Sequence, residues 1–353
     1  MRPARAADGR PVLRLASGLE IRRGNLLAGL GLVLAVLALG LISLGVGATR
    51  TGPAELIGTL LGTGSGDGAF AILEVRLPRI ALGFLAGWCV ALVGAALQSL
   101  ARNPLADPGL LGLSQGSMAA IVLMLVFLPA APLGLIPFAA IGGGLAVAGL
   151  LIALVGGARA GGMAILLMGI AVETVLSSLT AILILYAPPE TSYALSDWLA
   201  GSLFQASWGA IAALGPWVAL SLPAIAILGR PLRVLDLGDE MAMSLGDPVL
   251  RSRPAILLAA VVLTSAAVTA VGPLSFLGVM APHLAGALTR STGRARLVLS
   301  GLMGGLLVVA ADTLSRGVGG GIALPIGLSL TMIGVPLFIL TLRLRLLAAM
   351  RTD

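Results

Sequence analysis

The sequence predicts an all-α, polytopic membrane protein with ten transmembrane helices and both termini in the cytoplasm. Three observations lead to this fold class. The composition is 58% hydrophobic and only 10% charged, with a mean hydropathy of +1.07, which is typical of a chain that is solvated by lipid. The chain also contains ten apolar runs of membrane-spanning length. Finally, its arginines are concentrated in alternate loops between those runs.

The apolar runs follow one another with short connections. A bilayer core needs roughly 20 apolar residues per helix, and Pro and Gly are tolerated inside such helices because neighbours satisfy the freed backbone groups. The first run, at about 26–46, is too long for a signal-peptide core, so we interpret it as a retained span. A broken or re-entrant helix is the alternative for 272–290. The predicted spans lie near 25–45, 80–100, 110–129, 133–155, 163–186, 209–229, 254–272, 275–290, 297–316 and 325–342.

The placement of the basic residues tests this topology independently. All 22 are arginine. With the amino terminus inside, 18 fall on the cytoplasmic side and only Arg50, Arg76, Arg79 and Arg316 fall outside, an asymmetry that requires an even number of spans. The clusters lie in short loops, which disfavours nucleic-acid binding. The predicted organisation is a cytoplasmic segment 1–24, a permease domain 25–345 with a cytoplasmic insert 230–253, and a cytoplasmic tail 346–353.

Catalytic chemistry is disfavoured by the residues that the chain lacks. A phosphate-binding P-loop needs a lysine, and the chain has none. The single histidine, His283, has no second histidine with which to form a metal site or a nearby cysteine to activate. We interpret His283 as a structural hydrogen-bonding group near a helix break and Cys89 as a packing residue. We therefore expect no metal site and no catalytic residue in this chain.

Two arginines flank a Leu-Pro pair in "EVRLPRIALGF" (74–84). Arg76 and Arg79 precede a long apolar run on the side of the membrane where arginine is otherwise rare. Interfacial arginines can extend their charged ends toward water and serve as plain anchors. They can also orient an incoming partner, because rim charges affect association rate and register. The local sequence leaves both interpretations open.

The longest polar insert contains "GDEMAMSLG" (238–246). Asp239 and Glu240 stand at the favoured amino end of a short helix, Met241 and Leu245 lie one turn apart, and Gly246 is a stop signal. Two helical turns are not stable alone. The segment is therefore expected to pack against its own spans or against a cytoplasmic partner.

The loop "ARNPLADPGLLGLSQG" (101–116) joins the second and third predicted spans. Asn103-Pro104 and Asp107-Pro108-Gly109 are strong turn signals. The small residues that follow allow helices to approach closely. Taken alone, the pattern favours a tight inner loop.

The fifth predicted span carries a polar stripe. Gly169, Glu173, Ser177 and Thr180 follow the spacing of one helix face. An ionisable group at membrane depth is costly and usually faces a cavity or the bundle interior. The stripe either lines a transport pathway or bonds to a neighbouring helix.

Together these motifs resemble the FecCD family of ABC importer permeases, which carry ferric siderophores, haem and cobalamin across the bacterial inner membrane. The resemblance covers about residues 50–345. The motifs that carry it are "RLPR" (76–79), "RNPLADPGLLGLSQG" (102–116), "LGDEMAMSLG" (237–246), "GPLSFLGVMAPHLAGALTR" (272–290), "ADTLSR" (311–316) and "LPIGLSLTMIGVPLF" (324–338).

The resemblance implies partners. A second copy or a paralogue would complete the pathway, an ATPase dimer would bind ATP and Mg²⁺ below it, and a periplasmic binding protein would deliver the cargo. Membrane lipid would surround the spans. No cofactor is expected in this chain.

The resemblance also implies site residues. An ATPase-coupling helix would comprise Gly238, Asp239, Glu240, Leu245 and Gly246. Binding-protein docking would involve Arg76, Arg79 and Arg316. The inner constriction would include Asn103, Leu105, Gly162 and Met163. Gly286 and Ala287 stand where many relatives place an arginine, and Glu173, with Ser177, remains a local pathway hypothesis.

The predicted function is a permease subunit that moves a ferric siderophore with energy from a separate ATPase. Haem and cobalamin are alternative cargoes. An ion-coupled secondary transporter is the rival class, because such proteins use intramembrane carboxylates for coupling. Glu173 is its only clear candidate. An integral-membrane enzyme is disfavoured by the single histidine, the single cysteine and the absence of lysine.

Overall fold

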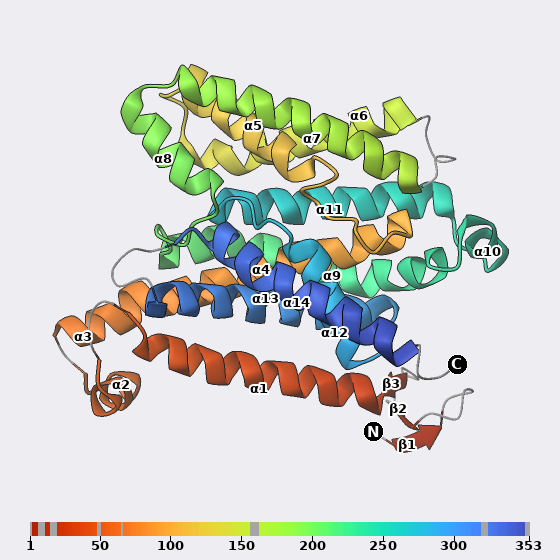
Figure 1. Cartoon of the computed structure of the whole chain (residues 1–353), viewed down its shortest axis with the longest axis horizontal. Helices are drawn as coiled ribbons and strands as arrows, with labels where there is room; N and C mark the ends of the chain where they lie inside the picture. Colours follow the sequence, from red (N-terminus) through yellow and green to blue (C-terminus); the bar gives the residue numbers. More distant parts are fainter. Residues whose placement is uncertain are drawn as a thin grey trace.

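The computed structural model describes residues 2–5, 11–14, 20–47, 51–64, 66–155, 162–318 and 324–349. Ten long helices form one bundle (Figure 1). Each coincides with one predicted span, and they are α1 (Arg23–Gly45), α4 (Leu77–Ala101), α5 (Leu113–Phe127), α6 (Ile136–Val155), α7 (Gly162–Leu185), α9 (Trp208–Leu235), α11 (Val249–Val271), α12 (Leu277–Leu288), α13 (Gly293–Val318) and α14 (Ile326–Ala349).

The described helices agree with a protein that crosses the membrane several times. Seven helical segments within the described ranges are long and apolar enough to span a bilayer. Three shorter apolar helices, Leu113–Phe127, Leu277–Leu288 and Ile326–Thr341, account for the remaining predicted spans. The multi-span helical class is therefore confirmed. Ten crossings and the sidedness of the termini stay predictions.

Short elements connect the long helices. They are α2 (Pro53–Leu60), α3 (Asp67–Phe70), the π-helical turn η1 (Ala71–Arg76), the 3-10 turn η2 (Leu133–Leu135), α8 (Pro189–Leu199) and α10 (Asp239–Ser244). The bundle is also not purely helical. A small antiparallel sheet precedes α1, with strand order β1 (Arg2–Arg5), β2 (Pro11–Arg14), β3 (Glu20–Arg22). Strand pairing depends on contacts between separate segments of the chain. These stretches of three and four residues show no clear alternation of apolar and polar side chains, so the sequence offered no signal for the sheet.

The centre of the bundle is built around α4 and α13, which cross at glycines. A Cβ added at Gly87 would lie 2.6 Å from the carbonyl oxygen of Gly304, so only glycine permits this approach. A Cβ at Gly94 would lie 2.1 Å from the carbonyl oxygen of Gly278 at the start of α12. Close backbone contact of this kind is the usual packing mode of membrane helices. Cys89 is fully buried between these crossings, which confirms its packing role.

The peripheral helices are much less covered by protein. Only 11% of the apolar window of α1 is buried, against 72% for the windows containing α4 and α13. Figure 1 shows α1 along one edge of the bundle, with α5, α6 and α7 near the opposite edge. The exposed leucines of α1 are therefore suited to lipid contact.

One predicted boundary agrees with the structure, and another differs from it in an informative way. The chain breaks between α11 and α12, where Gly272 and Phe276 both have positive φ (72° and 65°), which is where the separate spans 254–272 and 275–290 were predicted to meet. Helix α12 is continuous from Leu277 to Leu288, and a broken or re-entrant path through the membrane stays a prediction. Helix α9 continues through Arg230 and Arg233 to Leu235. A helix needs no apolar side chains once it leaves the bilayer, so the non-helical part of the insert is shorter than 230–253.

Candidate functional site

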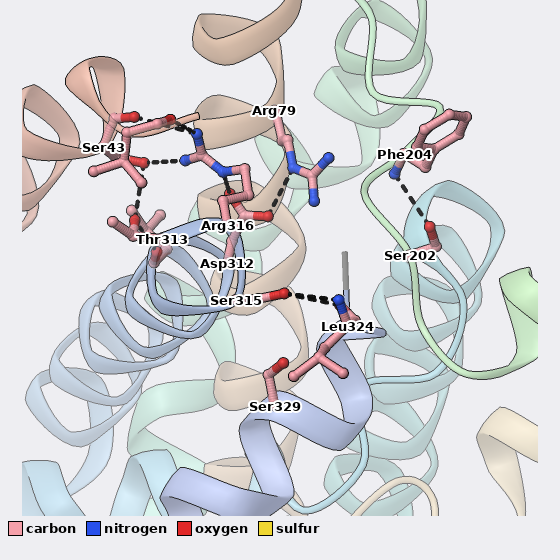
Figure 2. A network of polar contacts seen from close by, with 12 residues as sticks. Ser43, Arg79, Ser202, Phe204, Asp312, Thr313, Ser315, Arg316, Leu324 and Ser329 are labelled. Atoms are coloured by element: carbon pink, nitrogen blue, oxygen red, sulfur yellow. Dashed lines mark hydrogen bonds and ion pairs between the residues drawn. The ribbon is translucent and has the colours of Figure 1, made fainter. Parts of the chain in front are cut away.

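One cluster of polar side chains lies at the end of the bundle opposite α10 (Figure 2). The carboxylate of Asp312 on α13 accepts from Nε of Arg79 on α4 at 2.7 Å and from Nε of Arg316 at 2.9 Å. The Asp312 side chain is 2% exposed, and the arginine side chains are 13% and 10% exposed. One buried carboxylate therefore joins two guanidinium groups, with charge-assisted bonds at both oxygens.

The same cluster closes the carboxyl end of α1. Arg316 donates through Nη1 to the backbone carbonyls of Ser43 and Val46. Arg76 donates through Nη1 to the carbonyl of Leu44 at 2.6 Å and to Oγ1 of Thr51 at 2.7 Å. The last carbonyls of a helix have no partner within the helix and carry partial negative charge, so two cations at this end satisfy and stabilise them.

Arg76 itself is only 4% exposed. A Cβ at Gly47 would lie 2.9–3.1 Å from the guanidinium of Arg76, so the glycine leaves room for that group. The structure thus brings together the three arginines that the resemblance assigns to partner docking. It places them inside a network that ties α1, α4 and α13 together, rather than extended on an open rim. Docking stays a prediction for all three, and Arg50 lies outside the described residues.

A second candidate site is α10, at the opposite end of the bundle. The predicted short helix is present. It begins directly after Gly238 (φ 101°) and ends at Ser244, two residues before Gly246 (φ 81°). These positive φ values favour glycine at both positions. Asp239 is bound by Nη2 of Arg253 on α11, at 2.7 Å from each carboxylate oxygen. This pair holds a helix that is too short to be stable alone.

The outward face of α10 is apolar and uncovered. Met241, Met243 and Leu245 are 50%, 56% and 51% exposed, and Glu240 is exposed beside them. Ala242 alone is buried against the bundle. Apolar side chains gathered on a surface outside the hydrophobic spans are typical of a protein contact.

The loop after α4 lies next to this helix, because a Cβ at Gly238 would lie 3.1 Å from Nη1 of Arg102. Asn103 Oδ1 accepts from the backbone N–H of Leu105 at 2.9 Å, which is the turn predicted from Asn-Pro. The Leu105 side chain is 46% exposed. The backbone of Gly162 and Met163 opens α7, and the Met163 side chain lies outside the described residues.

Asp107 is the buried acid of this loop, and sequence reasoning used it only as a turn signal. Its Oδ1 accepts from the N–H of Gly109 at 2.7 Å. Burial raises the pKa of its carboxyl to about 6, while the backbone N–H groups of Gly109, Leu110, Gly278 and Val279 oppose that rise. Asp107 thus faces the amino end of α12 and links the inner loop to the broken helix.

The polar stripe of α7 faces its neighbour α5. Glu173 Oε1 accepts from Nε2 of Gln115 at 3.4 Å, and the Glu173 side chain is half-buried. Gly169 packs against the backbone of Leu111, 2.8 Å from the position a Cβ would take. Ser177 is half-buried on the same face. The observed contact is the helix-to-helix bond that the sequence offered as one alternative, and a pathway role stays a prediction.

His283 has the structural role expected of it. Its Nε2 lies 2.9 Å from Oγ1 of Thr341, which joins α12 to α14, and its ring packs on Phe338 at 4.8 Å between centroids. Within the described ranges, no three His, Cys, Asp or Glu side chains are grouped closely enough to hold a metal. Arg296, which sequence reasoning did not single out, donates to Gln98 and Ser99 and so links α13 to α4.

The fold and these sites define a class of protein. It is a helical protein with several candidate membrane spans, whose central helices cross at glycines. One end of the bundle carries a short helix with exposed apolar side chains, and the other end carries a largely buried arginine network.

Comparison with known proteins agrees with this class. Residues 34–344 match the FecCD transport family. The chain is 36% identical to the Fe(3+)-citrate import system permease protein YfmE of Bacillus subtilis, over 90% of this chain and 95% of that protein. It is 36% identical to the Fe(3+) dicitrate transport system permease protein FecD of Escherichia coli, over 78% of this chain and 86% of that protein.

A solved structure described as an inward-facing conformation of a metal-chelate type ABC transporter has the same fold. Its TM-score is 0.77 at 24% identity, covering 90% of this chain and 99% of that one. The chain belongs to the FecCD transport family. It is therefore a transport subunit rather than an enzyme, and a multi-pass protein of the bacterial inner membrane.

Proposed function

We propose that this chain forms one half of the pathway of an ATP-driven importer for a ferric siderophore. All ten long helices would cross the membrane, with both termini and α10 in the cytoplasm. The observation that carries the proposal is α10, because this six-residue helix exposes Met241, Met243 and Leu245 and is joined to α11 by the Asp239–Arg253 pair. Such a helix can transmit motion from a partner into α9 and α11.

The partner below would be an ATPase dimer that binds ATP and Mg²⁺, since this chain has no P-loop lysine. A second copy or a paralogue would complete the pathway. The inner gate would comprise Asn103, Leu105, Gly162 and Met163, and Glu173 with Ser177 would lie beside the pathway. The names of the relatives, which specify Fe(3+)-citrate and Fe(3+) dicitrate, favour an iron chelate as cargo.

Uptake by proteoliposomes tests this proposal. They would contain the complete transporter, with the ATPase and the binding protein, and would be offered ferric citrate, ferric hydroxamates, haem and cobalamin. We expect ATP-dependent accumulation of one ferric chelate. Accumulation driven by an ion gradient without ATP would refute the proposal and favour the secondary-transporter class. Preferential uptake of haem or cobalamin would replace the cargo and leave the transporter class intact.

A charge substitution tests the role of α10 directly. Leu245→Glu places a carboxylate in the apolar contact, and we expect the ATPase to be lost on co-purification while the permease stays folded. Leu61→Glu is the matched control, because Leu61 is 76% exposed near α2 at the other end of the bundle. Equal retention of the ATPase by both variants would contradict a contact through α10.

The binding protein would dock at the opposite end, near Arg79 and Arg316. Because both arginines are paired with Asp312, reversing their charge would bury repulsive groups and unfold the network. The milder Arg79→Gln separates the two roles. We expect it to slow association with the loaded binding protein and to weaken the salt dependence of that rate. A slower rate with unchanged salt dependence would indicate a structural role only.

A further inference from the structure

A cleft with a volume of about 880 Å³ lies at the α10 end of the bundle (Figure 1), and none of its lining residues belongs to either candidate site. Its walls come from β3 and the start of α1, the end of α9, and the connection from α12 into α13. Its charged lining is strongly unbalanced, with a single acid, Glu20, against five arginines. These are Arg22, Arg230, Arg233, Arg290 and Arg294.

Most of this positive charge is not neutralised by the residues that the structure describes. Within the part of the chain that the structure describes, Arg230, Arg233 and Arg290 form no ion pair or hydrogen bond, and all three are exposed. Arg294 is oriented by two bonds from Nε and Nη2 to the carbonyl of Ala226, at 2.9 and 2.6 Å. That carbonyl is neutral, so the charge of Arg294 remains available. Gathering like charges is unfavourable unless an anion joins them.

The cleft has an apolar wall beneath its charged rim. Leu30 and Val33 of α1 and Leu302 of α13 line it about two turns or more further along their helices than Arg22 and Arg294. The back is closed because α9 and α13 touch at glycines: a Cβ at Gly293 would lie 2.5 Å from the carbonyl oxygen of Gly229. Since α1 is little covered by protein, the front opens along a helix face suited to lipid. A charged rim above an apolar, lipid-facing wall matches a molecule with an anionic head and hydrocarbon chains.

We propose that this cleft binds an anionic phospholipid of the cytoplasmic leaflet, with its phosphate among the arginines and its acyl chains along α1 and α13. The sidedness rests on the topology in the proposed function. Arginine suits this role because its planar guanidinium donates two parallel bonds to phosphate oxygens. Basic pockets between membrane helices on the cytoplasmic side bind such headgroups.

Lipid binding to the purified full transporter complex provides the test. The complex is delipidated in detergent and titrated with phosphatidylglycerol or phosphatidylcholine, and bound lipid is counted by native mass spectrometry. The test variant carries Arg230→Gln, Arg233→Gln and Arg290→Gln. The control carries Arg23→Gln, Arg251→Gln and Arg343→Gln, three exposed arginines outside the cleft lining. Thermal unfolding verifies that each is folded.

We expect the unaltered complex to bind phosphatidylglycerol at least tenfold more tightly than phosphatidylcholine. The test variant should lose about tenfold or more of that affinity, on the basis of the contribution of each basic residue near anionic lipid. The control should keep it. If the triple variant does not fold, single Arg290→Gln against Arg343→Gln gives the same comparison with a smaller expected loss.

Several results would overturn the proposal. One is equal binding of the two lipids by the unaltered complex, and another is full retention of phosphatidylglycerol by the test variant. Displacement of the lipid by millimolar inorganic phosphate would indicate a site for a free anion instead. Loss of the ATPase with lipid retained would indicate a protein contact. None of these readouts requires transport, so failure here is distinguishable from failure of the proposed importer function.

Discussion

Removing the charge of Asp312 is expected to destabilise the protein strongly. Its carboxylate is 2% exposed and pairs with Arg79 at 2.7 Å and Arg316 at 2.9 Å. In Asp312→Asn the side chain keeps its shape, but two largely buried guanidinium groups lose their shared counter-charge. Leaving a buried charge unpaired costs about 3–5 kcal/mol. We therefore expect a loss of this size in the free energy of unfolding.

Asp236→Asn is the matched control for this change. It is the same substitution at an acid that lies 3.5 Å from Arg296, in a pair whose side chains are 24% and 26% exposed. A pair that is partly solvated contributes about 1 kcal/mol or less. The free energy of unfolding of both variants would be measured in mixed micelles with increasing sodium dodecyl sulfate. If the losses caused by Asp312→Asn and Asp236→Asn differ by less than about 1 kcal/mol, Asp312 is not a buried bridge between the two arginines.

The double variant Asp312→Asn, Arg79→Gln makes the test sharper. If the loss arises from an unpaired guanidinium, removing that guanidinium as well should restore part of the stability, so the two losses should not add. Strict additivity would show that the two side chains act independently.

Three further predictions concern the inner half of the bundle. Gly94→Ala should push α4 away from α12, because the added Cβ would lie 2.1 Å from a carbonyl oxygen. Size-exclusion chromatography should then recover no folded protein. Gly149→Ala is the control and should fold normally, because no atom lies within 4 Å of the position its Cβ would take. Burial raises the pKa of Asp107 in the folded protein to about 6, against an ordinary value of 3.8, so its protonation stabilises the fold as pH falls from about 6 to 4. Asp107→Asn should therefore make the thermal unfolding temperature less dependent on pH over that range. An unchanged pH dependence would contradict this. Glu173→Gln should alter uptake of one chelate more than another if the residue borders the pathway, and uniform uptake would leave only its bond to Gln115.

Local patterns were sufficient for the helices. Apolar run length predicted all ten long helices, because a continuous apolar run of about this length is a local signal for a helix solvated by lipid or by other helices. The glycines at 238 and 246 and the acids after Gly238 predicted α10, because helix caps and stops are decided by neighbouring residues. The Gly-Pro and Ser-Phe region at 272–276 likewise indicated the break before α12.

Asp312 shows where local reasoning was insufficient. Its i, i+4 spacing from Arg316 was a readable signal for an ion pair, and it was not used. Its bond to Arg79 crosses 233 positions of sequence, which no local pattern encodes. For the same reason no local pattern showed that the arginines which the resemblance assigns to docking are largely buried.

The sequence by itself determined the class of protein, the number of apolar helices and the short helix α10, since hydrophobic length and capping chemistry depend only on residues close together in the chain. The tertiary structure decided which arginines are paired and which surround the open cleft. It also decided that Glu173 meets Gln115 and that Asp107 faces α12. These outcomes depend on how distant helices are rotated and aligned against one another, and that alignment is set by the glycine crossings at the centre of the bundle.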